Sequence, residues 1–305
     1  MREFHAKENS CELVFLQLGD CYHLWTPENH EIIFTNDADF RFGMNAIGIS
    51  ARLFPEVRIL TFELMSNHIH IAAAARKDRL LLLFDSFTAL ILKWLKSEGR
   101  HISLKSFQPG LRQLTSLDEL RNVIVYDNRN GYVISQHHTP FTYPWGANRY
   151  YYSPDTCQLA MLLSKKLSLR ERRRISHSRI ADNAEGLLLF EDCAMPLSFC
   201  DISTGESLFR NATQYFSKIS KSIESSREIA KEIGESVWYT DDELYSIVRK
   251  ISQEQYNIHS PSQLPSPAKI DLAKTLRYDY NASQKQILRM LKVDKVILQS
   301  LGITR

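Results

Sequence analysis

Residues 57–74 read VRILTFELMSNHIHIAAA, with two apolar segments on either side of a short polar one. The segments Val57 to Leu64 and Ile69 to Ala74 are short and predominantly apolar, which is typical of buried strands. The turn-like residues Met65-Ser66-Asn67 separate them. The stretch therefore predicts two neighbouring antiparallel strands.

Two histidines follow the turn in the pattern His68-Ile69-His70. Alternate residues of a strand point to the same face, so the two imidazoles would lie side by side while Ile69 enters the core. Two adjacent imidazoles can bind one divalent metal ion. Incidental histidines produce the same short pattern, so a metal site needs support from a second element.

A helix further along the chain supplies that second element. Ser116-Leu117-Asp118-Glu119 fits a capping box and predicts a helix that runs to about Asn130, with Gly131 as its stop. Tyr126 and Asn130 are four residues apart and share a face of this helix. A phenol oxygen is a nucleophile for phosphodiesters, and an amide oxygen is a neutral metal ligand. The alternative for Tyr126 is a core residue of an amphipathic helix.

The other elements of the first half complete a mixed α and β pattern. Strands are predicted over Leu13 to Leu18 and Tyr22 to Thr26, helices over Asp37 to Leu53 and Arg79 to Lys96, and an extended segment over Ile102 to Leu114. The resulting order predicts an α+β fold, an antiparallel sheet with helices on one side that resembles ferredoxin-like and RRM-like folds.

Four segments together resemble the REP-associated tyrosine transposases, which are single-tyrosine HUH nucleases. FELMSNHIH (62–70) resembles the family's M-P-N-H-x-H, and YDNRNG (126–131) is similar to its Y-I-H-x-N-P. YPWG (143–146), followed by Arg149-Tyr150, resembles Y-x-W-S-S, and YHL (22–24), followed by Ile33-Phe34, resembles the first strand and loop. The resemblance covers residues 20 to 152 in the family's order.

The resemblance implies metal-dependent cleavage and rejoining of single-stranded, hairpin-forming DNA. Tyr126 would be the nucleophile and would form a covalent 5′-phosphotyrosine, leaving a 3′-hydroxyl. The metal ligands would be His68, His70 and Asn130. Oxygen ligands from the amide and from phosphate suit Mg²⁺ or Mn²⁺.

Three positions depart from the family pattern. Ser66 and Gly131 replace prolines, and Asp127 stands where an apolar residue is usual. A carboxylate beside the nucleophile either weakens phosphate binding or adds a metal contact, and the sequence leaves both alternatives open.

Bulk composition excludes several classes of protein. The chain has 305 residues, of which 44% are hydrophobic and 24% charged, as in globular domains. Its longest apolar run, Leu80 to Phe84, is far too short to span a bilayer, so no membrane partner is expected. The N-terminus lacks an apolar signal core, and the five cysteines include no CxxC motif. We therefore expect a cytoplasmic protein with reduced thiols.

Positive charge is concentrated in two segments, although the whole chain carries only +3. Residues 165–179 include seven Lys or Arg and one acidic residue, and residues 266–305 carry a net +5. Such segments can neutralise phosphates, or they can be ordinary solvated helix faces. The expected contacts with the DNA backbone are Arg129, Arg172, Arg173 and Arg174.

The predicted domains are a nuclease domain over 1–152, a helical domain over 153–256, a Pro- and Ser-rich linker over 257–268 and a DNA-binding segment over 269–305. The last segment resembles a helix-turn-helix whose second helix would present Lys295 and Gln299 to the major groove. The alternative is a helical hairpin that packs on the body of the protein or on another chain.

The expected function is thus that of a transposase-like DNA strand transferase, with a homodimer as one possible assembly. The alternative is a DNA-binding regulator that keeps the fold with little catalytic turnover. A third possibility, an RNA-binding module on an RRM-like sheet, requires exposed aromatic side chains that stack on bases, and the sequence shows no clear motif of that kind.

Overall fold

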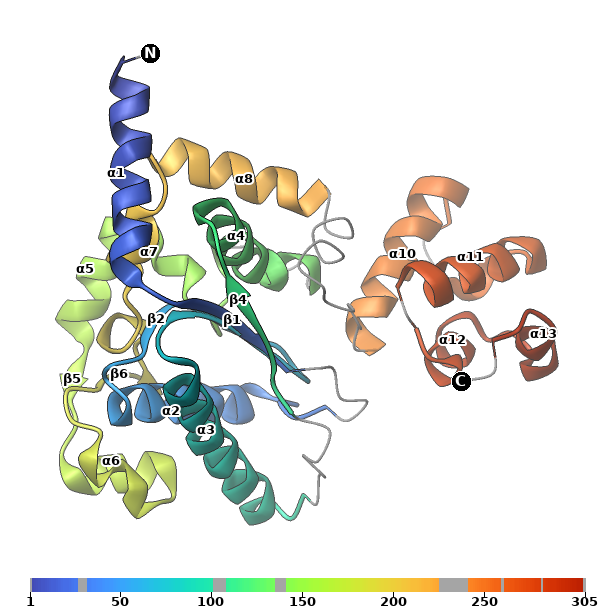
Figure 1. The fold of residues 1–305 in the computed structure, drawn as a ribbon. Coiled ribbons are helices and arrows are strands. Elements are labelled where there is room, and N and C mark those ends of the chain that lie inside the picture. Colours follow the sequence, from blue (N-terminus) through green and yellow to red (C-terminus); the bar gives the residue numbers. More distant parts are fainter. Residues whose placement is uncertain are drawn as a thin grey trace. The chain divides into compact units, whose positions relative to one another are not determined.

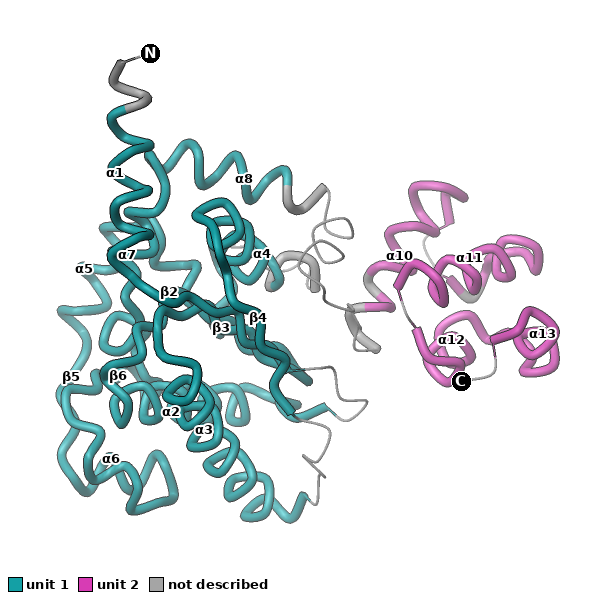
Figure 2. Tube along the Cα trace, viewed as in Figure 1, with its two compact units in different colours: residues 1–131, 138–224 teal, residues 132–137, 225–305 magenta. Residues whose placement is uncertain are grey.

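A computed structural model describes residues 2–26, 32–100, 108–134, 141–224, 241–258, 261–280 and 282–303. The chain divides into two compact units (Figure 2). Unit 1 comprises residues 1–131 and 138–224, and unit 2 comprises residues 132–137 and 225–305. None of the described helices has the length and apolar character needed to cross a membrane.

Unit 1 is built around a four-stranded antiparallel sheet in the order β2-β3-β1-β4 (Figure 1). Its strands are β1 (Cys21–Trp25), β2 (Arg58–Leu64), β3 (Ile69–Ala74) and β4 (Gly110–Leu114). The tight turn between β2 and β3 is closed by a hydrogen bond from the Met65 amide to the His68 carbonyl, 2.9 Å long. The predicted α+β class with an antiparallel sheet is confirmed.

One face of the sheet is apolar and carries two helices, α2 (Asp37–Leu53) and α3 (Lys77–Ser97). Phe62 and Leu64 of β2 point to this face and are fully buried. Helix α2 can approach closely because Gly43 has no side chain: a Cβ there would lie 2.9 Å from Leu64 Cδ1. Burial of these apolar faces is the main driving force for this layer.

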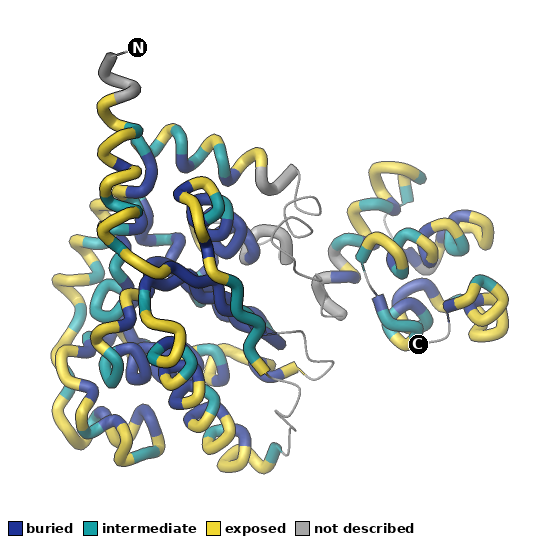
Figure 3. Tube along the Cα trace, viewed as in Figure 1, coloured by how far each residue is buried: buried dark blue, intermediate teal, exposed yellow. Residues whose placement is uncertain are grey.

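The opposite face of the sheet carries polar side chains and is covered by α4 (Leu117–Ile134) (Figure 1). Thr61, on this face of β2, donates a hydrogen bond to Asn128 of α4. Helices therefore cover both faces, and the prediction of helices on one side alone is wrong in this respect. Strands β2 and β3 are buried on both faces, which requires a second covering layer (Figure 3).

Helix α1 (Arg2–Leu18) occupies the segment in which a strand was predicted over Leu13 to Leu18. Cys11 is buried, whereas Leu13 and Leu16 are exposed, so the apolar residues do not alternate as a strand requires. An ion pair between Glu8 and Arg121 of α4 joins this helix to the body of unit 1.

Residues 141–224 fold onto unit 1 and do not form part of a separate helical domain, in contrast to the predicted boundary at 152/153. Their helices are α5 (Pro154–Leu163), α6 (Leu169–Ser176), α7 (Ile202–Ser207) and α8 (Ala212–Glu224), and a small sheet contains β5 (Lys165–Lys166), β6 (Leu188–Phe190) and β7 (Cys193–Ala194). Asn45 of α2 accepts a 2.8 Å hydrogen bond from the Ala194 amide. Contacts over such long sequence separations are not visible in local composition.

Unit 2 consists of α10 (Asp241–Tyr256), α11 (Ser266–Asp279), α12 (Gln284–Leu291) and α13 (Lys295–Ser300) around its own apolar core. The predicted linker over 257–268 is instead partly structured. Leu264 and Ala268 are buried in the core, the latter within the first turn of α11. Ser283 and Gln286 form a capping box that begins α12.

Candidate metal centre and nucleophile

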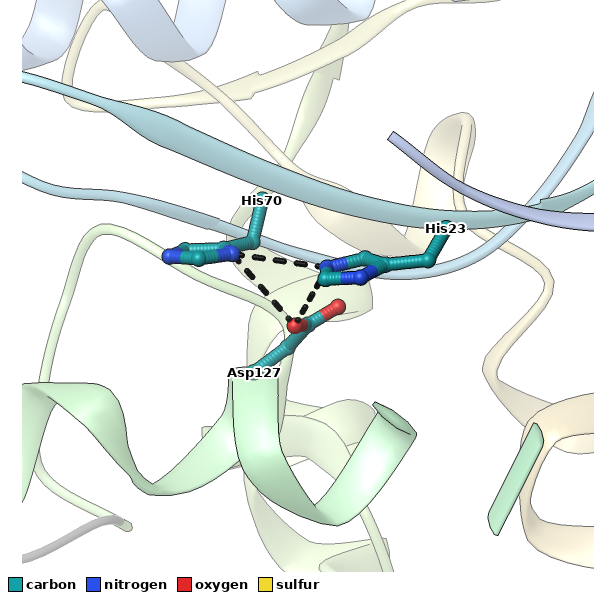
Figure 4. Close-up of side chains that lie close together, drawn as sticks. All are labelled: His23, His70 and Asp127. Atoms are coloured by element: carbon teal, nitrogen blue, oxygen red, sulfur yellow. Dashed lines mark hydrogen bonds and ion pairs between the residues drawn. The ribbon is translucent and has the colours of Figure 1, made fainter. Parts of the chain in front are cut away.

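Asp127 lies on α4 with its carboxylate completely buried against the polar face of the sheet (Figure 4). Two strand histidines approach it, His23 from β1 and His70 from β3. The Asp127 Oδ1 atom is 3.2 Å from His23 Nε2 and 3.6 Å from His70 Nδ1, and the two nitrogens are 3.4 Å apart. One oxygen and two nitrogen atoms thus converge on one point.

The spacing of these three atoms fits a bound metal ion. Ligand atoms about 2.1 Å from a tetrahedral ion lie about 3.4 Å from one another. Within the described part of the chain, this trio is the one group of three His, Cys, Asp or Glu side chains close enough to share an ion. Two imidazoles and one carboxylate form a donor set that divalent first-row metals accept.

The burial of the Asp127 carboxylate also fits a metal ligand. Neither oxygen of Asp127 accepts a well-aligned hydrogen bond from the described residues. Burying a carboxylate without such partners costs several kcal/mol, typically, and a coordinated cation removes most of this cost. The donor set and the burial therefore both fit a divalent ion.

Burial shifts the protonation equilibria of these side chains towards their neutral forms. It raises the pKa of Asp127, while the neighbouring His23 and Arg129 lower it. It lowers the pKa of His68 to about 3 and that of His70 well below its ordinary value. The two histidines are consequently neutral at physiological pH, which is the form that binds metals.

Tyr126 precedes Asp127 on α4 and packs against the cluster. Its ring meets that of His70 edge-on, with centroids 5.7 Å apart and an interplanar angle of 80°. The guanidinium of Arg129 lies 4.5 Å from the centre of the Tyr126 ring. Arg129, expected on the DNA backbone, is 2% exposed, and Tyr126 is 3% exposed. The nucleophile predicted from the sequence is thus beside the cluster and inside the protein.

His68 and Asn130, the other two ligands predicted from the sequence, occupy different positions relative to this trio. The His68 ring lies 4.8 Å from that of His70, and its Nδ1 forms a 2.7 Å hydrogen bond with the side chain of Asn67. Asn130 is buried on α4 and, among the described residues, makes no hydrogen bond to His68 or His70. Their ligand roles stay predictions.

A buried hydrogen-bond network fixes α4 beside the cluster. Asn128 donates a 2.7 Å hydrogen bond to the hydroxyl of Tyr215 on α8, and that hydroxyl donates in turn to Asn148. Asn128 also accepts from Thr61 of β2. Because all four side chains are buried, the loss of any partner leaves a polar group without hydrogen bonds. The network therefore holds the backbone on which Tyr126 and Asp127 are carried.

Trp25 extends the cluster along β1. Its ring stacks on that of His23, with centroids 5.0 Å apart. On β4 the position opposite Trp25 is Gly110, where a Cβ would lie 2.5 Å from the indole. Only glycine leaves room for the ring there, so His23 is held between Trp25 and Asp127.

The remaining residues predicted to bind DNA lie on α6 of unit 1 and on α13 of unit 2. Arg173 and Arg174 of α6 form paired hydrogen bonds with Asp182 and Asp192, and Arg172 is largely buried. In unit 2, Lys295 and Gln299 are exposed on α13. The α6 arginines are thus engaged within unit 1, whereas the α13 side chains face solvent.

Sequence reasoning missed His23 as part of the centre and left the role of Asp127 open. The available signal was strand periodicity, which places His23 and Trp25 on one face of β1. The register that sets Trp25 opposite His70 appears only in the structure.

Comparisons with protein-family models, with curated proteins and with solved structures find no match for this chain.

Proposed function

We propose that this chain is a transposase-like single-stranded DNA endonuclease and strand transferase that attacks phosphodiesters with Tyr126. The observation that carries the proposal is the edge-on packing of Tyr126 against His70, a member of the His23–His70–Asp127 cluster. A nucleophilic hydroxyl residue and a set of metal ligands are the two parts that metal-assisted phosphoryl transfer requires.

The topology supports the same proposal. Strands β1 and β3 are central, and the order β1-α2-β2-β3-α3-β4 corresponds to the split βαβ arrangement of ferredoxin-like domains. We also propose that residues 20 to 152 are related to the REP-associated tyrosine transposases. The proposal also includes DNA binding by α12 and α13, whose sequence resembles a helix-turn-helix.

The residues that would hold the metal are His23, His70 and Asp127, with His68 beside them. A bound divalent ion would supply Lewis-acid chemistry by polarising a non-bridging phosphate oxygen. Two imidazoles favour Mn²⁺ over Mg²⁺, because Mg²⁺ prefers an all-oxygen shell.

The proposed reaction balances without a nucleotide cofactor. The Tyr126 hydroxyl loses its proton as its oxygen bonds to phosphorus, and the bond from phosphorus to the 3′ oxygen breaks. The 3′ oxygen takes up a proton and leaves as a hydroxyl. Since one phosphoester replaces another, the attack of a 3′-hydroxyl on the phosphotyrosine reverses the step and joins strands.

The main alternative function is a DNA-binding regulator that carries out little or no cleavage. The observation that favours it is the burial of Tyr126, which is 3% exposed. Burial of Tyr126 restricts the access of a DNA phosphate, so the proposed enzyme includes local opening of unit 1 before chemistry.

A covalent-adduct assay separates the two functions. The protein is incubated with an end-labelled hairpin-containing single strand and Mn²⁺, then boiled in detergent and separated on a denaturing gel. The proposed enzyme gives a labelled protein band that disappears with EDTA. A protein that shifts the same strand on a native gel yet gives no adduct is the regulator.

A further inference from the structure

A cationic cavity of about 620 Å³ opens on unit 1. Its lining residues come from α1, from α8 and from the two residues before α8; both helices are labelled in Figure 1. Four of its lining residues are basic, and the others are uncharged polar residues: Lys7, Arg210, Lys218 and Lys221, with Asn211, Thr213, Gln214 and Ser217. Among the residues that the structure describes, no acidic residue lines it. We call it the α1–α8 groove.

The positive charge of the groove is poorly compensated by the protein. Glu8, the acidic neighbour, is already paired with Arg121 and lies 3.4 Å from Arg210. Within the described residues, no carboxylate comes within ion-pair distance of Lys218 or Lys221. An anion in the groove would provide the missing negative charge.

Helix α8 concentrates this charge on one face. Gln214, Lys218 and Lys221 are separated by four and three residues and therefore project from the same side. Like charges at such spacing repel one another, which destabilises a helix unless a counter-charge is bound. Burial also lowers the pKa of Lys218, and Arg121 and Lys221 act in the same direction, while Asp118 and Glu8 act against it.

The groove begins at the N-terminal end of the 13-residue helix α8 and extends to Lys221 in its last turn. Asn211 accepts a 2.9 Å hydrogen bond from the Gln214 amide at the N-terminal end, and both residues line the groove. The positive end of the helix dipole adds to the positive potential at that end of the groove. Cations distributed over two helices suit a chain of phosphates better than a single small anion.

We propose that the α1–α8 groove binds the phosphodiester backbone of single-stranded DNA and is the surface that holds the substrate strand. The identity of the strand rests on the proposed function. Helix α8 is joined to the site through the hydrogen bond between Tyr215 and Asn128, the residue after Asp127. Strand binding on one face of α8 is thus mechanically linked to the helix that carries Tyr126.

The α6 arginines provide a contrast on the same unit. Arg173 and Arg174 are each neutralised by an aspartate, whereas Lys218 and Lys221 are not. Both pairs carry the same formal charge. Replacing either pair therefore removes the same net charge from unit 1, but only one pair is placed to contact phosphates.

The test is the salt dependence of binding to oligo(dT), measured by fluorescence anisotropy in EDTA so that no cleavage occurs. For the Lys218→Gln/Lys221→Gln double variant, the slope of log K against log salt should fall by about 1.4, because each lost phosphate contact with a single strand is worth about 0.7. Lys218→Arg/Lys221→Arg keeps the charge and should keep the slope.

Arg173→Gln/Arg174→Gln is the matched control and should leave the slope unchanged. An unchanged slope in the Lys218/Lys221 double Gln variant overturns the inference, and so does an equal fall in the control, which would indicate a general charge effect. Tighter binding of oligo(U) than of oligo(dT) overturns the DNA assignment. The binding measurement does not depend on DNA cleavage. DNA binding in the groove without a covalent adduct would therefore refute the proposed enzyme while supporting the inference about the groove.

Discussion

His23 Nε2 and Asp127 Oδ1 lie 3.2 Å apart, and both side chains are completely buried. One belongs to a central strand and the other to a helix more than a hundred residues later, so this contact ties the covering helix to the sheet at the centre of unit 1. A charge in such a position is costly without a counter-ion. The pair is therefore where metal binding and folding stability should be linked.

Asp127→Asn should remove metal binding while leaving the metal-free protein at least as stable as before. The amide keeps the shape and removes a buried ionisable group whose charged form is disfavoured by burial. In wild type, Mn²⁺ at 100 times its dissociation constant should raise the free energy of unfolding by about 2.7 kcal/mol. This increment, measured by thermal unfolding with and without Mn²⁺, should vanish in the variant. Asp118→Asn, on the exposed side of the same helix, should retain it.

His23→Ala tests which residues form the ligand set. If the cluster binds the ion, removal of the His23 imidazole should weaken Mn²⁺ affinity by at least 100-fold, because a three-ligand site becomes a two-ligand site. Isothermal titration calorimetry measures this directly. Loss of affinity in His68→Ala combined with full affinity in His23→Ala would refute the cluster and support the ligand set implied by the family resemblance.

Tyr126→Phe should abolish the covalent DNA adduct and retain DNA binding. The change removes one buried hydroxyl, so the free energy of unfolding should fall by only about 1 kcal/mol. Tyr152→Phe is the matched control, since its hydroxyl donates a 2.7 Å hydrogen bond to the Glu206 carbonyl away from the cluster. It should keep the adduct. A labelled band that persists in Tyr126→Phe would show that another residue attacks.

Asp39 should contribute stability that depends on pH. Burial by itself raises its pKa, but hydrogen bonds from Thr35 and Trp94, together with Arg100, outweigh this and lower the pKa below its usual value. Its contribution is therefore complete above the pKa of the unfolded state and is lost as pH falls through the lower folded pKa. Asp39→Asn should cost about 2 kcal/mol at pH 7. Urea unfolding should show this difference shrinking below pH 4; a constant difference would contradict the assignment.

Local sequence patterns predicted much of the first half of the chain. The helix over Asp37–Leu53 and the strand over Ile69–Ala74 are confirmed to the residue, because apolar periodicity and turn residues act over short distances. The pairing of His68 with His70 follows from the same periodicity. Ser116 caps α4 as predicted, with a 3.2 Å hydrogen bond from the Glu119 amide.

Long-range features could not be predicted in this way. The approach of His23 to Asp127 depends on strand register and on the packing of α4, neither of which has a local signal. The return of residues 141–224 to unit 1 depends on contacts such as that between Arg58 and Asp201. The basic run on α6 gave no sign that Arg173 and Arg174 are paired with Asp182 and Asp192, which follow later in the chain.

The stacking of Trp25 on His23 gives the protein an optical property. An indole in contact with a ring that coordinates a metal changes its fluorescence when that ring gains or loses the ion, without any added dye. Two of the other three indoles have different surroundings: Trp94 donates to Asp39, and Trp145 stacks on Phe40. Emission from Trp25 would thus follow occupancy of the cluster in real time, which makes the order of metal binding and strand binding accessible to stopped-flow kinetics.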